Sequence, residues 1–192
     1  MSDAGPSLLQ GLHHVGLVVR DLDRSIRFYH DVLGLPFASE PTAWFDGPQL
    51  EKGVGVPGAT LRTVCFRAGD SSMVELIEYG NRPASSTAPV PNNHLGAAHV
   101  CFRVADVRAS KAALEARGVS FYSEVNVVDD GPLAGWRWVY LSDPDGLAVE
   151  LVEIAYSHDD ERATASAAYL RDRPPLAAGD EPGAPERSSA VS

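Results

Sequence analysis

The chain has 192 residues, of which 44% are hydrophobic and 22% are charged, a composition typical of a folded globular protein. Its formal net charge of −10 disfavours nucleic acids and anionic membranes as partners, because both are negatively charged. No apolar run reaches the roughly 20 residues of a membrane span, and the first residues lack the pattern of a signal peptide. We therefore expect a cytoplasmic protein with a packed core.

The first half of the chain predicts a strand, a helix and then further strands. The strand that begins at His14 ends at Asp21, a residue type that commonly caps the N-terminus of a helix. Apolar residues at helical spacing follow, and Gly34 stands where a left-handed C-cap is expected. Two strand-like runs close this half, at 61–66 and 74–78.

The second half of the chain repeats this order. The block from His99 to Asp106 matches the block that starts at His14, and Gly118 takes the place of the earlier C-cap. Strand-like runs follow at 136–141 and 149–153. The repeat predicts two modules, each with one strand, one helix and about three further strands.

The repeat divides the chain into four segments. The first module is expected at 11–80 and the second at 96–156, with a linker rich in Pro, Ser and Asn at 81–95. The segment 157–192 is rich in Ala, Pro, Gly, Ser and acidic residues. We expect a disordered tail there, because the segment has too little apolar surface to offset the entropy of ordering.

Two histidines and two glutamates occupy equivalent positions in the repeat. Alternation along a strand places His14 and His99 on the face away from the helix of their module. Glu75 and Glu150 are each flanked by apolar residues, where an unpaired carboxylate is costly. Two neutral imidazoles and two carboxylates balance the charge of a divalent cation, so these residues predict a site for Mn, Fe, Co, Ni or Zn.

Other candidate ligands fit this pattern less well. His13 competes with His14, since a shift of one residue in register exchanges their faces, but the match with His99 favours His14. Cys65 and Cys101 lie in apolar, strand-like runs without CxxC spacing. We expect both cysteines to be buried free thiols.

These motifs resemble those of the vicinal oxygen chelate superfamily, which includes glyoxalase I, methylmalonyl-CoA epimerase, extradiol dioxygenases and bleomycin resistance proteins. The similarity covers roughly residues 11–156 and rests on the segments 12–15, 20–29, 74–76, 96–100 and 143–151. The resemblance implies an α+β fold in which two tandem βαβββ modules form a half-open barrel around one divalent metal. The metal ligands that it implies are His14, Glu75, His99 and Glu150.

The resemblance also implies a metal-dependent isomerase, epimerase or lyase of the glyoxalase type. Such an enzyme chelates a small, oxygen-rich substrate to the metal and stabilises an enolate as a proton leaves the carbon beside a carbonyl. Glu150 is then expected to be both ligand and base. Glu51, in the sequence Glu51-Lys52-Gly53-Val54, is similar to the partner base of methylmalonyl-CoA epimerase.

Departures from the family pattern leave alternatives open. Bacterial glyoxalase I carries glutathione-binding Arg and Asn residues where this chain has Val18 and Tyr79. An extradiol dioxygenase would use Tyr140, which is correctly spaced, but the His expected before it is absent from 131–133. A drug-binding resistance protein without chemistry is the other alternative, although such proteins often lack the four ligands.

Two questions of arrangement also stay open. The linker is long enough for the modules to pair within one chain or across a dimer, and we expect a homodimer. Trp136, Trp138 and Tyr140 share one face of their strand, which is either part of the core or a wall for a substrate.

Overall fold

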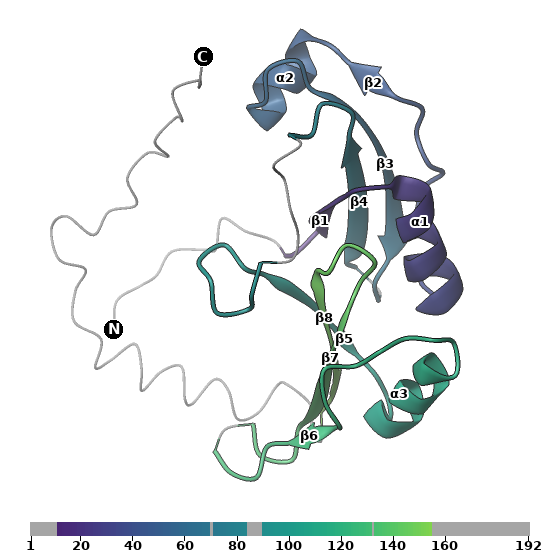
Figure 1. The fold of residues 1–192 in the computed structure, drawn as a ribbon, viewed down its shortest axis with the longest axis vertical. Helices are drawn as coiled ribbons and strands as arrows, with labels where there is room; N and C mark the ends of the chain where they lie inside the picture. Colours follow the sequence, from purple (N-terminus) through teal and green to yellow (C-terminus); the bar gives the residue numbers. More distant parts are fainter. Residues whose placement is uncertain (1–10, 70, 84–89, 132, 155–192) are drawn as a thin grey trace, which may run out of the picture. The chain divides into compact units, whose positions relative to one another are not determined.

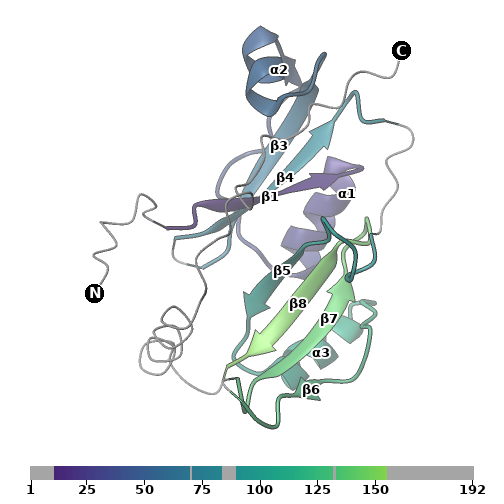
Figure 2. The ribbon, with the colours of Figure 1, turned by 90° about the vertical axis from the view of Figure 1, so that its left-hand side faces the viewer.

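The structure is a computed structural model that describes residues 11–69, 71–83, 90–131 and 133–154. Over these residues the chain forms two four-stranded mixed sheets, each with a helix against one face (Figures 1 and 2). The predicted disordered tail and part of the predicted linker lie outside the described residues. No helix in the described part of the chain is long and apolar enough to cross a membrane.

The first module has the strand order β1-β4-β3-β2. β1 runs parallel to β4, and β3 runs antiparallel to both β4 and β2. Its elements in chain order are β1 (His14–Val19), α1 (Leu22–Ile26), the π-helical segment η1 (Arg27–Val32), β2 (Phe45–Asp46), α2 (Pro48–Val54), β3 (Thr60–Arg67) and β4 (Met73–Tyr79).

The second module has the matching order β5-β8-β7-β6, again with its first and last strands parallel. The two sheets confirm the prediction of an α+β fold with tandem βαβββ modules. The elements of this module are β5 (His99–Arg103), α3 (Val107–Glu115), β6 (Asn126–Val127), β7 (Arg137–Ser142) and β8 (Ala148–Glu153).

The strand register shows that the two modules match residue by residue. In each module the last strand, β4 or β8, lies between the first and the third strand of that module. The residues that lie side by side across these strands therefore have counterparts in the other module. Around the predicted carboxylates the equivalent pairs are Gly16 and Cys101, Cys65 and Tyr140, and Glu75 and Glu150.

Two carboxylates hold the start of the helix in each module. Asp21 accepts a hydrogen bond from a backbone N–H of the first turn of α1 at 2.9 Å, and Glu78 accepts another at 2.7 Å. Asp106 and Glu153 accept equivalent bonds from α3 at 2.9 and 3.0 Å. These carboxylates stabilise the helices because the first N–H groups of a helix have no partner within it. The predicted aspartate caps are confirmed.

The predicted glycine C-caps are confirmed as well. Gly34 has φ +81° and Gly118 has φ +84°, the left-handed conformation that glycine adopts without a steric penalty.

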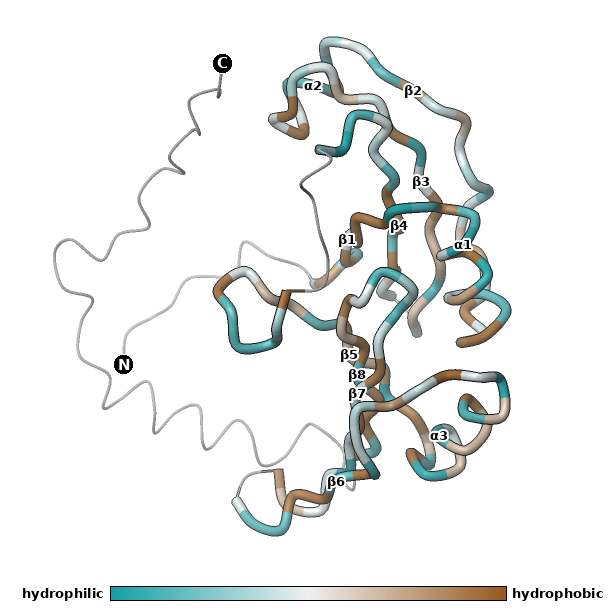
Figure 3. Tube along the Cα trace, viewed as in Figure 1, coloured by the Kyte–Doolittle hydropathy of each residue, from teal (hydrophilic) through white to brown (hydrophobic). Residues whose placement is uncertain are grey.

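The core lies on the helix-covered face of each sheet. Leu17 and Val19 of β1 are buried there, and so is Val100 of β5, as alternation predicted. Hydrophobic and hydrophilic stretches alternate around the turns of α1 and α3 (Figure 3). Most of the buried apolar residues of both modules belong to one cluster. The other face of each sheet, which we call the open face, is left for polar side chains.

The loop between β7 and β8 contacts the first module directly. The hydroxyl of Tyr29, a fully buried residue, donates a hydrogen bond to the carboxylate of Asp143 at 3.2 Å. Asp145 accepts a hydrogen bond from the backbone N–H of Arg20 at 2.6 Å and pairs with the guanidinium of Arg24. Through these contacts the loop between β7 and β8 binds the segment that connects β1 to α1 and the helical residues that follow it.

Burial raises the pKa of Tyr29, and the nearby charge of Asp143 raises it further. A Tyr29→Phe variant removes the hydroxyl that Asp143 binds, so we expect it to lose about 1–3 kcal/mol of unfolding free energy in urea titrations. The difference in unfolding free energy between the wild type and Tyr29→Phe is fully present below pH 10.0, the ordinary pKa of tyrosine. It declines at higher pH, because tyrosine ionises more readily in the unfolded chain than in the folded protein.

The matched control is Tyr79→Phe, at a half-buried tyrosine of β4, which should change the unfolding free energy by less than about 0.5 kcal/mol. Equal stability of the Tyr29→Phe variant and the wild type at neutral pH would contradict this account of the contact.

Candidate functional site

The four predicted ligands lie on the open faces of the two sheets, as two pairs on neighbouring parallel strands. The Nε2 atom of His14 lies 3.5 Å from Oε2 of Glu75, and the same atoms of His99 and Glu150 are 3.1 Å apart. The imidazoles are 45% and 46% exposed, whereas the glutamate side chains are 23% and 16% exposed. Each pair therefore presents an accessible nitrogen beside a shielded carboxylate.

The structure does not bring the two pairs together within one chain. Among the described residues, no group of three or more His, Cys, Asp or Glu side chains is placed to hold a metal ion. The donor chemistry nevertheless fits a divalent transition metal, because each pair offers an imidazole nitrogen and a carboxylate oxygen. We call His14 with Glu75 the first half-site and His99 with Glu150 the second.

The first half-site has a second imidazole and a small residue beside it. The Nδ1 atoms of His13 and His14 lie 2.8 Å apart, so one of the two rings donates a hydrogen bond to the other. Gly16 faces Glu75 across the strands, and a Cβ at this glycine would lie 3.9 Å from Oε2 of Glu75. A Cβ at Gly16 would also lie 3.4 Å from Cδ1 of Ile77, so a side chain at this position would pack against both residues.

The second half-site includes Tyr140, which the sequence analysis considered only for the dioxygenase alternative and as a residue of the core or of a substrate wall. The hydroxyl of Tyr140 lies 3.2 Å from Oε2 of Glu150 and 3.3 Å from Nε2 of His99. Burial raises the pKa of Tyr140 to about 12, and the charge of Glu150 contributes. Only the register of β7 against β8 places the two residues side by side. The phenol is therefore a hydrogen-bond donor to the carboxylate.

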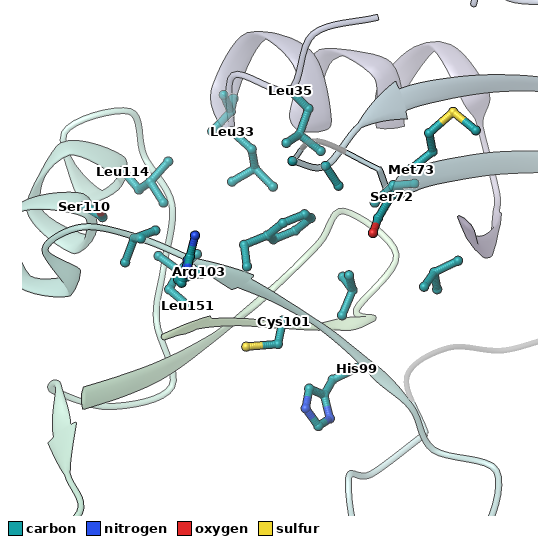
Figure 4. Close-up of a pocket in the computed structure, with 18 of the residues that line it drawn as sticks. Leu33, Leu35, Ser72, Met73, His99, Cys101, Arg103, Ser110, Leu114 and Leu151 are labelled. Atoms are coloured by element: carbon teal, nitrogen blue, oxygen red, sulfur yellow. The ribbon is translucent and has the colours of Figure 1, made fainter. Parts of the chain in front are cut away.

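The prediction of two free cysteines is confirmed, but the prediction that both are buried is wrong. Cys65 and Cys101 are both free, but Cys65 is half-buried and Cys101 is exposed. Both lie on the open faces, beside Glu75 and Glu150 respectively, because alternation along β3 and β5 turns them away from the core. In Figure 4, Cys101 and His99 project from the same side of β5.

Glu51 lies on the short helix α2. Its carboxylate accepts a hydrogen bond from the backbone N–H of Gly58 at 2.9 Å, which closes the turn between α2 and β3. Its role as a second base stays a prediction.

A cavity of about 840 Å³ runs along β5, the edge strand of the second sheet. Figure 4 shows Leu33 and Leu35 from the first module on one side of it, with His99 and Cys101 on the far side of the strand. Of the four predicted ligands, His99 alone is among its lining residues. This cavity therefore does not unite the half-sites.

Two tandem βαβββ modules with half-sites on their open faces define a duplicated α+β protein with the features of the vicinal oxygen chelate fold. The family model for the Glyoxalase/Bleomycin resistance protein/Dioxygenase superfamily matches residues 11–151. The chain belongs to this superfamily, as the sequence motifs predicted.

Curated relatives include enzymes. A 2-epi-5-epi-valiolone epimerase from an Actinomyces species is 33% identical over 145 residues, which cover 74% of this chain and 79% of the epimerase. A lactoylglutathione lyase from Pseudomonas aeruginosa is 30% identical over 148 residues, covering 73% of this chain and 81% of the lyase.

Solved structures support the fold. The crystal structure of a glyoxalase family protein from Bacillus cereus matches with a TM-score of 0.62 at 23% identity, over 80% of this chain and 98% of that protein.

Although Cys101 is exposed, the sheet around its thiol partly excludes water, and this desolvation together with the charge of Glu150 raises the pKa of Cys101 to about 12. A Glu150→Gln change removes that charge, so the pKa should fall and the thiolate fraction at pH 8 should rise, about tenfold for each pKa unit. We expect faster reaction of Cys101 with Ellman's reagent in a Cys65→Ser background, where Cys101 is the only thiol.

Glu75→Gln in the same background is the matched control, because Glu75 lies beside position 65 and not beside Cys101. Its rate should equal that of the parent. Equal rates for Glu150→Gln and the parent would show that Glu150 does not act on the thiol.

Proposed function

We propose that this protein is a metal-dependent isomerase, epimerase or lyase that moves a proton on the carbon beside a carbonyl of a small, oxygen-rich substrate. The observation that carries the proposal is the recurrence of a histidine–glutamate pair at equivalent positions of both modules. The enzymes among the curated relatives, an epimerase and lactoylglutathione lyases, support the same type of reaction.

The proposed metal ligands are the two half-sites together: His14, Glu75, His99 and Glu150. A bound Mn, Fe, Co, Ni or Zn ion would supply a Lewis acid that stabilises negative charge on the substrate oxygens.

We assign the complete site to two copies of the chain. His14 lies on β1 and His99 on β5, and each of these strands is an edge of its sheet. Exposed strand edges are normally covered, and a second copy that brings its β1 beside β5 would cover both. Such a homodimer joins the first half-site of one chain to the second half-site of the other.

Glu150 is the proposed base. Its carboxylate is largely shielded and accepts a hydrogen bond from Tyr140, which holds one oxygen in place. The carboxylate would take the proton from the carbon beside the carbonyl and return it in the second half of the reaction. If the reaction is an epimerisation, the proton must be removed and returned on opposite faces of that carbon, and Glu51 is the proposed partner base for the second face.

Mixed dimers test the two-chain site. His14→Ala and His99→Ala chains, each purified alone, should bind no metal by elemental analysis. Co-expressed with different affinity tags and purified as the heterodimer, the two should recover about one metal ion per dimer, because one of the two shared sites keeps both histidines. A heterodimer without metal, beside a metal-loaded wild type, would indicate that the site closes within each chain.

Proton exchange tests the chemistry. The wild type with metal should exchange the proton beside the carbonyl of 2-epi-5-epi-valiolone, or convert the glutathione adduct of methylglyoxal, in deuterated water followed by NMR. Glu150→Gln should lower the rate about 10²–10⁴-fold even at saturating metal, because it removes the base as well as a ligand.

Glu75→Gln is the matched variant, since it alters a ligand at the equivalent position without removing the base, and excess metal should restore most of its rate. Failure of the metal-loaded wild type to exchange any proton would contradict the proposal. Oxygen consumption with a catechol would then favour the dioxygenase alternative, for which the position of Tyr140 beside His99 is the specific observation.

A further inference from the structure

The cavity along β5 has no role in the site described above. Its volume of about 840 Å³ falls within the roughly 300–1,000 Å³ of typical small-molecule sites. Residues of both modules line it, and Figure 4 shows Leu33 and Leu35 from the first module and Leu114 and Leu151 from the second around it. The cavity is therefore a space between the modules.

Most residues that line the cavity are apolar. Alternation along β5 turns Val100 and Phe102 toward the helix-covered face, whereas His99 and Cys101 lie on the open face. Val100 and Leu114 keep 9% and 8% of their surface exposed, the two highest values in the cluster of buried core residues. The core of the second module is thus slightly open toward the cavity.

The charges at the cavity are all positive. Arg103 and Arg117 line it, and none of the described Asp or Glu residues does. The composition does not predict this sign, because the chain has 26 acidic and 16 basic residues. Arg117 donates to the backbone carbonyl of Val32 at 2.6 Å, which leaves its charge uncompensated, and Arg103 forms no ion pair in the part of the chain that the structure describes.

The positive charge and the apolar lining are arranged along the cavity. Arg103 ends β5, an edge strand, so its long side chain reaches the cavity although alternation starts it on the open face. Figure 4 shows Arg103 and Ser110 toward one end and Met73 toward the other, with Leu33 and Leu35 between them. A matching ligand is apolar along its length and anionic at one end.

We propose that this cavity binds a fatty carboxylate of medium chain length, with the carboxylate at Arg103 and the alkyl chain along Leu33 and Leu35. The guanidinium fork of arginine matches a carboxylate, and burial of each CH₂ group adds affinity. The inference goes beyond the proposed function and does not depend on it, because the apolar residues of β5 in this lining and the second half-site lie on opposite faces of the strand.

Calorimetric titration of the full chain tests the site with three probes: decanoate, decan-1-ol and acetate. The wild type should bind decanoate more tightly than decan-1-ol, and acetate should not bind measurably because it lacks the alkyl chain. Arg103→Gln should weaken the Kd for decanoate about threefold to fivefold, the range of an exposed ion pair, and leave the Kd for decan-1-ol unchanged.

Arg108→Gln is the matched control, since it makes the same change at an exposed arginine of α3 outside the cavity lining, and its Kd for decanoate should equal that of the wild type. Ala113→Phe tests the position of the alkyl chain. Ala113 is an exposed residue of α3 that lines the cavity, so a phenyl ring there should fill the space and abolish binding of both decanoate and decan-1-ol. Circular dichroism checks that each variant is folded.

Equal affinity of the wild type for decanoate and decan-1-ol would overturn the inference. Unchanged decanoate binding in Ala113→Phe, or equal effects of Arg103→Gln and Arg108→Gln, would overturn it too, because the ligand would then bind elsewhere. Dissociation of a dimer by decanoate in sedimentation experiments would also count against it, since the ligand would be displacing a second copy from an interface. Binding of decanoate by a chain that holds no metal would leave the cavity assigned and the proposed function refuted.

Discussion

Two-residue alternation along the strands is the constraint on which the rest of this structure depends. In β1 and β5 it sends apolar residues under the helix and leaves His14 and His99 on the open face. In the closing strands it turns Glu75 and Glu150 to that same face, between core residues on either side. Parallel pairing of the first and last strands then sets each histidine beside a glutamate. A one-residue slip in either strand would separate the pair.

The same alternation gives the second glutamate of each closing strand a different role. Glu78 and Glu153 lie three residues after the predicted ligands, so they face the helix and accept its first N–H groups. Arg62 and Arg137 pair with them from the neighbouring strands. Each module thus uses one carboxylate of its closing strand to stabilise the fold and leaves the other on the open face beside a histidine.

The internal repeat shows which features the fold requires, because those features occur in both modules. Helix caps, glycine turns and buried apolar positions recur in both modules, because each module has to solve the same packing problem. The aromatic residues Tyr122, Trp138 and Tyr140 contact one another in the second module only, and the equivalent positions of the first module carry Ala38, Thr63 and Cys65. The histidine–glutamate pairs also recur, on the open faces of both sheets.

The sequence by itself determined the two modules, their helix caps and the faces on which the histidines and glutamates lie, since these follow from local periodicity and an internal repeat. Only the tertiary structure decided that Tyr140 adjoins Glu150, that Cys101 lies on the open face beside it, and that the loop at Asp143 binds Tyr29. It also decided that the half-sites stay apart within one chain. Those facts depend on strand register and module packing, which bring together residues distant in sequence and leave no periodic signal.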